Sequence, residues 1–249
     1  MNILLLGGTT EASALARTLA GQPWQATLSL AGRTREPVPQ PIPCRVGGFG
    51  GVAGLAAYLR ENRVDALVDA THPFAAQMIR HAAAAAAETG TPLLRIDRPA
   101  WTPREGAVWH RVATMQEAAD ALGLAPRRVL LTVGQKDLGP FTAAPQHAYV
   151  VRSIDPPAAP PPGALVLTAR GPFLEADERA LLQEHRIEVM VSKNAGGTAT
   201  AAKLAAATDL GVPVVMVERP VLPAGLATVA TAAEAFDWLA RHAGTLRRE

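Results

Sequence analysis

The stretch NILLLGGTTEASALARTLAG, residues 2–21, decides the fold class of this chain. It begins with a short apolar run, long enough for one buried strand of a parallel sheet. Gly7 and Gly8 then allow a tight turn, and Thr9 and Thr10 can cap a helix with an apolar face. A strand that feeds a helix N-terminus through glycines can bind a phosphate, because free N–H groups and the positive end of the helix dipole meet there. The stretch therefore predicts a nucleotide site.

The glycine pattern departs from the dinucleotide fingerprint G-x-G-x-x-G/A at one position. The aligned residues are Gly7, Thr9 and Ala12. Ala12 fits, since a small residue is needed where the helix meets the strand. Thr9 does not fit, so a pyrophosphate would sit differently, with help from the threonine hydroxyls. An ordinary strand–helix turn without a ligand is the alternative.

Composition indicates a folded protein with ample material for a core. Of its 249 residues, 49% are hydrophobic, which suits one large or two small domains. Only three of the 24 basic residues are lysines, namely Lys136, Lys193 and Lys203. The arginine excess reflects either a GC-rich genome or an anionic ligand held by forked donors. A net charge of +2 without a basic tract argues against a nucleic-acid partner.

Cysteine usage and the termini narrow the class further. Cys44 is the only cysteine, so a disulfide within the chain and a thiolate zinc cluster are both excluded. Met1 leads almost directly into the first strand, which predicts no signal peptide. The alanine run after His81 is too short to span a membrane. We therefore expect a cytoplasmic protein without a membrane partner.

Strands and helices alternate along the whole chain, which predicts parallel, doubly wound sheets. In the first half we expect strands at 2–6, 24–30, 44–46, 66–69 and 92–96, and helices at 10–20, 52–62 and up to residue 89. In the second half we expect strands near 108–112, 129–133, 149–154, 165–168, 187–192 and 214–218, and helices near 115–122, 175–185, 198–210 and 232–243. We place a domain boundary near Arg98. The fold prediction is α/β, with a Rossmann-like domain at 1–98, a second at 99–249, and a cleft between them.

Ligands of doubly wound sheets bind beyond the carboxyl ends of the strands. The loops there are GGTT, SLAGRTR, GGFGG, THPF, VGQK, TARGPF and KNAGG. The loop after the second strand favours NADP(H), because it carries Ser29, Arg33 and Arg35 and no acid before Glu36. A solvated basic loop is the alternative. GGFGG, residues 47–51, permits close approach to a phosphate or a flat ligand, or is merely a flexible turn.

Three further loops offer polar groups. In THPFA, Pro73 suits the first helical position, so His72 is expected near a helix N-terminus, where neutral imidazole is favoured. His72 could contact nicotinamide or substrate, and a capping role is the alternative. Lys136 and Lys193 stand at strand ends, where they could meet a phosphate or a carboxylate, and Arg170 is a third candidate cation.

Several known motifs are missing from the sequence. There is no G-x-x-x-x-G-K-[ST] loop, no H-E-x-x-H or paired-cysteine metal motif and no G-x-S-x-G elbow. Neither Tyr58 nor Tyr149 has a lysine four residues on, which excludes the Tyr-x-x-x-Lys pair of short-chain dehydrogenases.

Six motifs in order resemble the precorrin-6A reductase family of corrin biosynthesis. They are LLLGGTTEA, DATHPFA, LLRIDRPAW, VGQKDL, TARGPF and SKNAGG, and the resemblance as a whole extends from residue 3 to about residue 219. The resemblance implies an NADPH-dependent reduction of one double bond of precorrin-6A, giving precorrin-6B. It also implies a tetrapyrrole partner whose carboxylates meet cationic loops, allows contact with neighbouring corrin-pathway enzymes, and implies no metal in the protein.

The candidate site residues follow from these loops and the resemblance. Cofactor binding is predicted for Gly7, Gly8, Thr9, Thr10, Glu11, Ser29, Gly32, Arg33, Gly48, Phe49, Gly50, Thr71 and His72. Substrate binding is predicted for Lys136, Arg170, Lys193, Asn194, Gly196 and Gly197. His72, Lys136 and Lys193 are proton-donor candidates by location only, with bound water as the alternative. Metal-free substrate is favoured over a cobalt-bearing one.

Other functions stay open at this stage. A redox sensor would bind NADPH and turn nothing over, although the second-domain loops weigh against it. A reductase of a smaller enone or imine would share the nucleotide site. A corrin methyltransferase would bind S-adenosylmethionine and have no use for Arg33 and Arg35.

Overall fold

The computed structural model describes residues 1–32, 34, 36 and 38–246. The chain forms two compact units: Met1–Pro99 together with Pro220–Glu249, and Ala100–Arg219. We call them the first and second units and describe each by itself. The prediction of two Rossmann-like, parallel-sheet α/β domains is confirmed.

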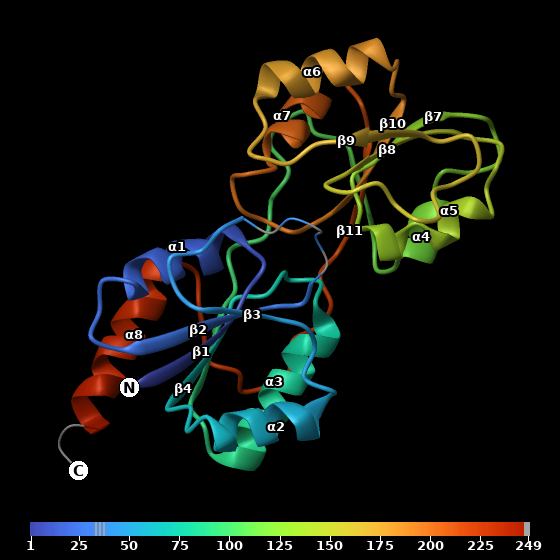
Figure 1. Ribbon diagram of the computed structural model, residues 1–249. Coiled ribbons are helices and arrows are strands. Elements are labelled where there is room, and N and C mark those ends of the chain that lie inside the picture. Colours follow the sequence, from blue (N-terminus) through green and yellow to red (C-terminus); the bar gives the residue numbers. More distant parts are fainter. Residues whose placement is uncertain (33, 35, 37, 247–249) are drawn as a thin grey trace. The chain divides into compact units, whose positions relative to one another are not determined.

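The first unit is built on a six-stranded parallel sheet of order β12-β5-β4-β1-β2-β3. The strands are β1 (Asn2–Leu6), β2 (Gln25–Leu30), β3 (Cys44–Val46), β4 (Ala66–Asp69), β5 (Leu93–Ile96) and β12 (Thr228–Val229). The helices are α1 (Thr10–Leu19), α2 (Val52–Glu61), α3 (Ala76–Thr89) and α8 (Ala232–Leu246). α1 packs beside α8 and α2 beside α3, on opposite faces of the sheet (Figure 1).

β1 is buried on both faces, as its uninterrupted apolar run requires. Ile3 and Leu5 belong to the core under α1 and α8, whereas Leu4 and Leu6 belong to the core under α2 and α3. All four side chains are at most 2% exposed. β1 is an interior strand of the sheet, so the turn that follows it at Gly7 lies in the middle part of the sheet's carboxyl edge.

The carboxyl-terminal segment belongs to the first unit, which differs from the predicted second domain at 99–249. β12 pairs with β5, where the Arg95 N–H donates to the Ala227 carbonyl at 2.9 Å. In α8, Ala235 and Leu239 are fully buried in the core shared with α1. The physical reason is this apolar face, which completes a core that the first 99 residues leave open.

The second unit has a six-stranded parallel sheet of order β6-β11-β10-β7-β8-β9. Its strands are β6 (Trp109–Val112), β7 (Arg128–Leu131), β8 (Ala148–Ser153), β9 (Leu165–Thr168), β10 (Val189–Lys193) and β11 (Val214–Val217). Its helices are α4 (Met115–Asp120), the short η1 (Gln135–Asp137), α5 (Gly139–Thr142), α6 (Glu175–Glu184) and α7 (Ala202–Asp209). α6 packs against α7, and α4 against α5 (Figure 1). α7 begins four residues later than expected from the sequence, after a turn over residues 199–201.

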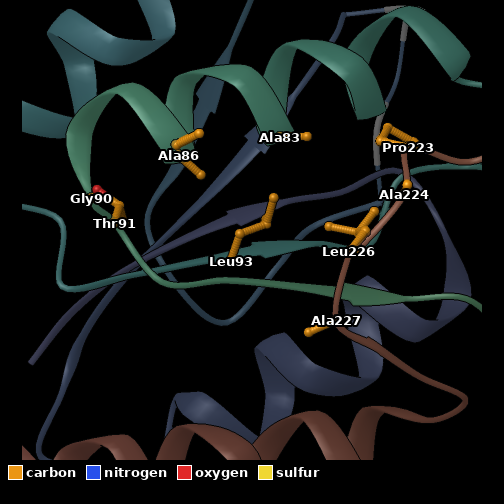
Figure 2. Close-up of a pocket in the computed structure, with 11 residues that line it drawn as sticks. Ala83, Ala86, Gly90, Thr91, Leu93, Pro223, Ala224, Leu226 and Ala227 are labelled. Carbon is orange, nitrogen blue, oxygen red and sulfur yellow. The ribbon is translucent and has the colours of Figure 1, made fainter.

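A hollow of about 380 Å³ lies in the first unit between α3 and the segment that returns before β12 (Figure 2). Leu93 and Leu226 face it, and most of its other lining residues are alanine or glycine. It adjoins the first residue of β5 rather than the strand's carboxyl end. It is therefore separate from the loops predicted to bind the nucleotide.

Candidate active site

The predicted nucleotide loops of the first unit lie along one edge of its sheet. β4, β1, β2 and β3 are consecutive parallel strands, so their carboxyl ends share that edge. The structure thereby brings together GGTT, the end of β2, GGFGG and THPF. Arg33 and Arg35, predicted to read a 2′-phosphate, lie outside the described residues.

The turn after β1 owes its sequence partly to packing. A Cβ at position 7 would lie 2.4 Å from Leu28 Cδ1, so Gly7 serves side-chain packing. Gly8 has φ +113°, a backbone conformation that favours glycine. Thr9 is the N-cap of α1: its Oγ1 accepts the Ala12 N–H at 3.2 Å and donates to the Ala70 carbonyl at 2.7 Å. The departure from the dinucleotide fingerprint is therefore a helix cap.

An ion pair lies in the first turn of α1. Arg98 Nη1 is 2.6 Å from Glu11 Oε2, which also accepts the Thr10 hydroxyl at 3.1 Å. Burial raises the pKa of the Glu11 carboxyl, but the charge of Arg98 and the hydrogen bonds from Arg98, Thr10 and the backbone together outweigh it, so the pKa is lowered. Glu11 therefore remains a carboxylate and ties α1 to the segment after β5.

Arg45 on β3 is a residue that sequence reasoning missed. Its Nη1 donates to Ser29 Oγ at 2.7 Å and to the Gly47 carbonyl at 3.1 Å. Nη2 donates to the Gly48 carbonyl at 3.1 Å, and the guanidinium lies 3.9 Å from the centroid of the Phe49 ring. A cation on an aromatic ring thus stands at the end of β2, beside the predicted ligand Ser29. An arginine two residues before GGFGG is the signal that could have found it.

The GGFGG loop folds back on the first turn of α2. A Cβ at Gly54 would lie 1.7 Å from the Phe49 carbonyl oxygen, so only glycine fits there. The Phe49 ring packs edge-on against Tyr58, with centroids 5.2 Å apart. Gly48 differs from Gly8 and Gly54: its φ is not positive, and a Cβ there would meet no atom of the described residues within 4 Å.

A buried ion pair at the end of β4 holds the THPF loop in place. Arg95 Nη1 donates to Asp69 Oδ2 at 2.8 Å, and the Asp69 carboxylate also accepts the Thr71 N–H at 2.9 Å and its hydroxyl at 2.7 Å. Pro73 lies in a turn and α3 starts only at Ala76, so the expectation that Pro73 opens the helix was wrong. His72 Nδ1 instead accepts the Phe74 N–H at 3.2 Å, which places the imidazole on a turn before the helix.

In the second unit the structure brings VGQK and KNAGG together, because β7 and β10 are neighbours. Lys193 Nζ lies 2.7 Å from Asp137 Oδ2, so this lysine meets a carboxylate of its own chain. Lys136 is exposed on η1. Arg170 is exposed in the loop after β9, at the edge of the sheet and two strands from β7.

Asn194 is buried, 1% exposed, and its amide is engaged within the protein. Oδ1 accepts the Trp101 N–H at 2.8 Å, and Nδ2 donates to the Trp101 carbonyl and to Glu218 Oε2, both at 3.2 Å. Trp101 Nε1 donates to the Gly197 carbonyl at 2.8 Å. Asn194 thus clamps Trp101 onto the NAGG loop, a role that leaves its predicted contact with substrate without support from the geometry. Gly196 and Gly197 form the adjacent backbone.

The described residues offer neither a metal centre nor a membrane span. No three or more His, Cys, Asp or Glu residues among them are grouped so that they could hold a metal ion. No described helix combines the length and the apolar composition needed to cross a membrane.

Comparison with known proteins identifies the family. Residues 2–240 match the family model described as precorrin-6x reductase CbiJ/CobK. Precorrin-6A reductase of Rhodobacter capsulatus is 49% identical over 247 residues, 98% of each chain, and cobalt-precorrin-6A reductase of Priestia megaterium is 30% identical over 239 residues. A solved structure of CobK precorrin-6A reductase has a TM-score of 0.92, with 49% identity over 97% of each chain. The resemblance seen in the six motifs is confirmed, and the chain belongs to the precorrin-6x reductase family.

Proposed function

We propose that this protein reduces precorrin-6A to precorrin-6B with NADPH, the first unit binding the dinucleotide and the second the tetrapyrrole. The observation that supports this proposal most strongly is the match to a relative named precorrin-6A reductase, at 49% identity over 98% of each chain. Relatives named for the cobalt-bearing substrate are more distant, at about 30% identity. This difference favours the metal-free substrate.

The carboxyl edge of the first sheet fits a dinucleotide. Thr9 caps α1 at the turn after the central strand, and the first turn of that helix offers N–H groups to a phosphate. Gly48 is a glycine that the fold does not need, as expected where a ligand approaches the backbone closely. Arg45 presents a guanidinium at the end of β2, where NADP-binding proteins of this fold accommodate a 2′-phosphate.

NADPH, when bound, supplies the hydride, and solvent supplies the proton that completes reduction of the double bond. The chain's own part is to hold both reactants, which can contribute roughly 7–11 kcal/mol through proximity. His72, Lys136 and Lys193 stay our candidates for proton delivery, with bound water as the alternative. Lys193 Nζ donates a hydrogen bond to Asp137 Oδ2, and this pair holds the ammonium in place.

Cofactor choice is tested by titrating the protein with NADPH and NADH. We expect tight NADPH binding, weak NADH binding, and loss of the preference in Arg33→Ala and Arg45→Met. Arg60→Met is the matched control. Arg60 is an exposed arginine of the same unit, near the C-terminal end of α2, and it pairs with Glu88. Equal or absent binding of both nucleotides would remove the nucleotide assignment.

Turnover separates the remaining functions. Precorrin-6A incubated with NADPH carrying deuterium at the transferred position should give a product that contains one deuterium and is reduced by one double bond. A redox sensor would bind NADPH and form no product. A reductase of smaller enones or imines would reduce those compounds and leave precorrin-6A unchanged.

We also propose a cytoplasmic location and contact with neighbouring corrin-pathway enzymes. The family's role in a biosynthetic sequence supports both. Fractionation of the producing cell tests the first, and co-purification of pathway enzymes with the tagged chain tests the second.

A further inference from the structure

Lys203, in the first turn of α7, is buried, and it forms no ion pair with an acid in the described part of the chain. The residue is 5% exposed, and its Nζ donates to Thr132 Oγ1 at 3.2 Å. The ammonium lies 5.3 Å from the centroid of the Trp101 ring. Among the described residues no carboxylate comes within 4.0 Å of Nζ. A buried lysine with a single hydroxyl acceptor has two donors left to place.

The neighbouring charges pair among themselves. Arg152 on β8 forms a buried ion pair with Glu178 on α6, and its guanidinium lies 4.1 Å from the centroid of the Phe173 ring. Lys193 on β10 is paired with Asp137 on η1. Each of these cations therefore has its own acid. The cluster is electrically balanced when Lys203 is neutral and carries one uncompensated positive charge when Lys203 is protonated.

Lys203 lies where proteins of this fold class bind their ligands. Thr132 directly follows β7, and the NAGG loop directly follows β10, so the amine lies at the carboxyl edge of the second sheet. Ligands of open α/β sheets bind at this edge. Trp101 is held in place by hydrogen bonds with Asn194 and Gly197, and its aromatic ring covers the amine.

Electrostatics makes this amine responsive to an anion. Burial, followed by the positive charge of Arg152, lowers the pKa of Lys203 to about 7, and Lys193 acts in the same direction. Glu178 opposes the shift, but it is engaged with Arg152. A carboxylate placed beside the ammonium would favour the protonated form. Anion binding and proton uptake at this position are therefore thermodynamically linked.

We propose that Lys203 is the receptor for a carboxylate side chain of the tetrapyrrole acid, and that the protein takes up a proton as this group binds. The identity of the ligand rests on the proposed function. The site itself rests on the buried amine, its missing acid and its place at the sheet edge.

The test follows the lysine side chains directly by NMR. With only three lysines in the chain, protein labelled with ¹³C at lysine Cε gives three side-chain signals. Lys203→Met assigns one of them. In the free protein that signal should titrate near neutral pH, and with saturating precorrin-6A in the absence of NADPH it should stay protonated well above that pH. A signal that titrates identically with and without precorrin-6A would overturn the proposal.

Calorimetry with precorrin-6A in buffers of different ionisation enthalpy gives a second readout. Above neutral pH the wild-type protein should take up a proton on binding. Lys203→Met should abolish this uptake and weaken binding roughly tenfold or more. Arg127→Met is the matched control, because it removes an exposed cation at the amino end of β7 and should change neither quantity. Unchanged affinity and proton uptake in Lys203→Met would also overturn the proposal.

The two proposals fail in different ways. If precorrin-6A neither binds nor is reduced with NADPH, the proposed function is wrong. If it is reduced but the Lys203 signal does not respond to it, only the carboxylate receptor is wrong.

Discussion

The guanidinium of Arg95 lies 2.8 Å from the carboxylate of Asp69, and neither side chain is more than 1% exposed. The same carboxylate accepts the N–H and the hydroxyl of Thr71. A buried pair thus connects β5 and β4 to the loop that carries His72. Because β12 covers the outer edge of β5, the carboxyl-terminal segment helps to keep Arg95 away from water.

Breaking this pair should be costly. Arg95→Met leaves a buried carboxylate without its cation, and we expect a loss of about 3–5 kcal/mol in the free energy of unfolding. Asp69→Asn should also be destabilising but should cost less, because Asp97 Oδ1, 3.4 Å from Arg95 Nη2, still faces the guanidinium. The double variant should lose less than the sum of the two, since both charges are then gone. Urea denaturation measures all three, and additive losses would contradict the argument.

Alanine substitutions at Gly54 and at Gly48 should affect different properties, namely stability at Gly54 and NADPH binding at Gly48. Gly54→Ala forces a Cβ against the Phe49 carbonyl, so we expect about 1–3 kcal/mol of destabilisation. Gly48→Ala meets open space and an ordinary φ, so its stability should stay within about 0.5 kcal/mol of wild type. If a ligand approaches Gly48 closely, this variant should nevertheless bind NADPH at least tenfold more weakly. Thermal unfolding and NADPH titration of both variants check the pair, and normal NADPH affinity in Gly48→Ala would withdraw Gly48 from the site.

The carboxyl-terminal helix should be part of the first unit's core. Leu239→Ala removes a fully buried side chain beneath α8, so we expect a loss of about 2–5 kcal/mol. Arg241→Ala, an exposed change two residues on, serves as the control and should stay within about 0.5 kcal/mol. Hydrogen exchange should localise the loss for Leu239→Ala to the first unit. Equal protection in the two variants would show that α8 contributes little there.

The fold was largely predictable because buried parallel strands have apolar sequences that are bounded by glycine and proline. β3 (Cys44–Val46), β4 (Ala66–Asp69) and β9 (Leu165–Thr168) have the residues expected from the sequence. β12 was missed because a two-residue strand has no periodicity to detect. Its partner, β5, lies more than 100 residues earlier in the chain, and only tertiary packing joins them.

The candidate site was predictable as a set of loops but not as a set of contacts. The sequence shows Arg45 beside GGFGG, but its stacking on Phe49 depends on how that loop folds back over Gly54. Lys203 stood out as one of three lysines, yet nothing local shows that its ammonium is buried. Pro73 illustrates the opposite error, since a residue typical of a first helical turn lies here in the turn before the helix.

Burial of Lys203 should make stability depend on pH in a defined direction. Its folded pKa of about 7 lies below the ordinary value of 10.5, so between these values the unfolded chain binds more protons than the folded one. This contribution to the free energy of unfolding therefore rises with pH from about 7 to about 10.5, and below pH 7 the full penalty persists. The shift corresponds to roughly 5 kcal/mol as an upper bound.

Lys203→Met keeps much of the side-chain volume and removes the titrating group. We expect this variant to be more stable than wild type at pH 7, by up to about 4 kcal/mol, with the difference shrinking as pH rises toward 10. Urea denaturation of both proteins across this pH range measures the difference, in which groups common to both cancel. A difference that is independent of pH would mean that Lys203 titrates as an ordinary solvated lysine. A stabilising substitution at this position would indicate that the buried amine is kept for binding and not for the fold.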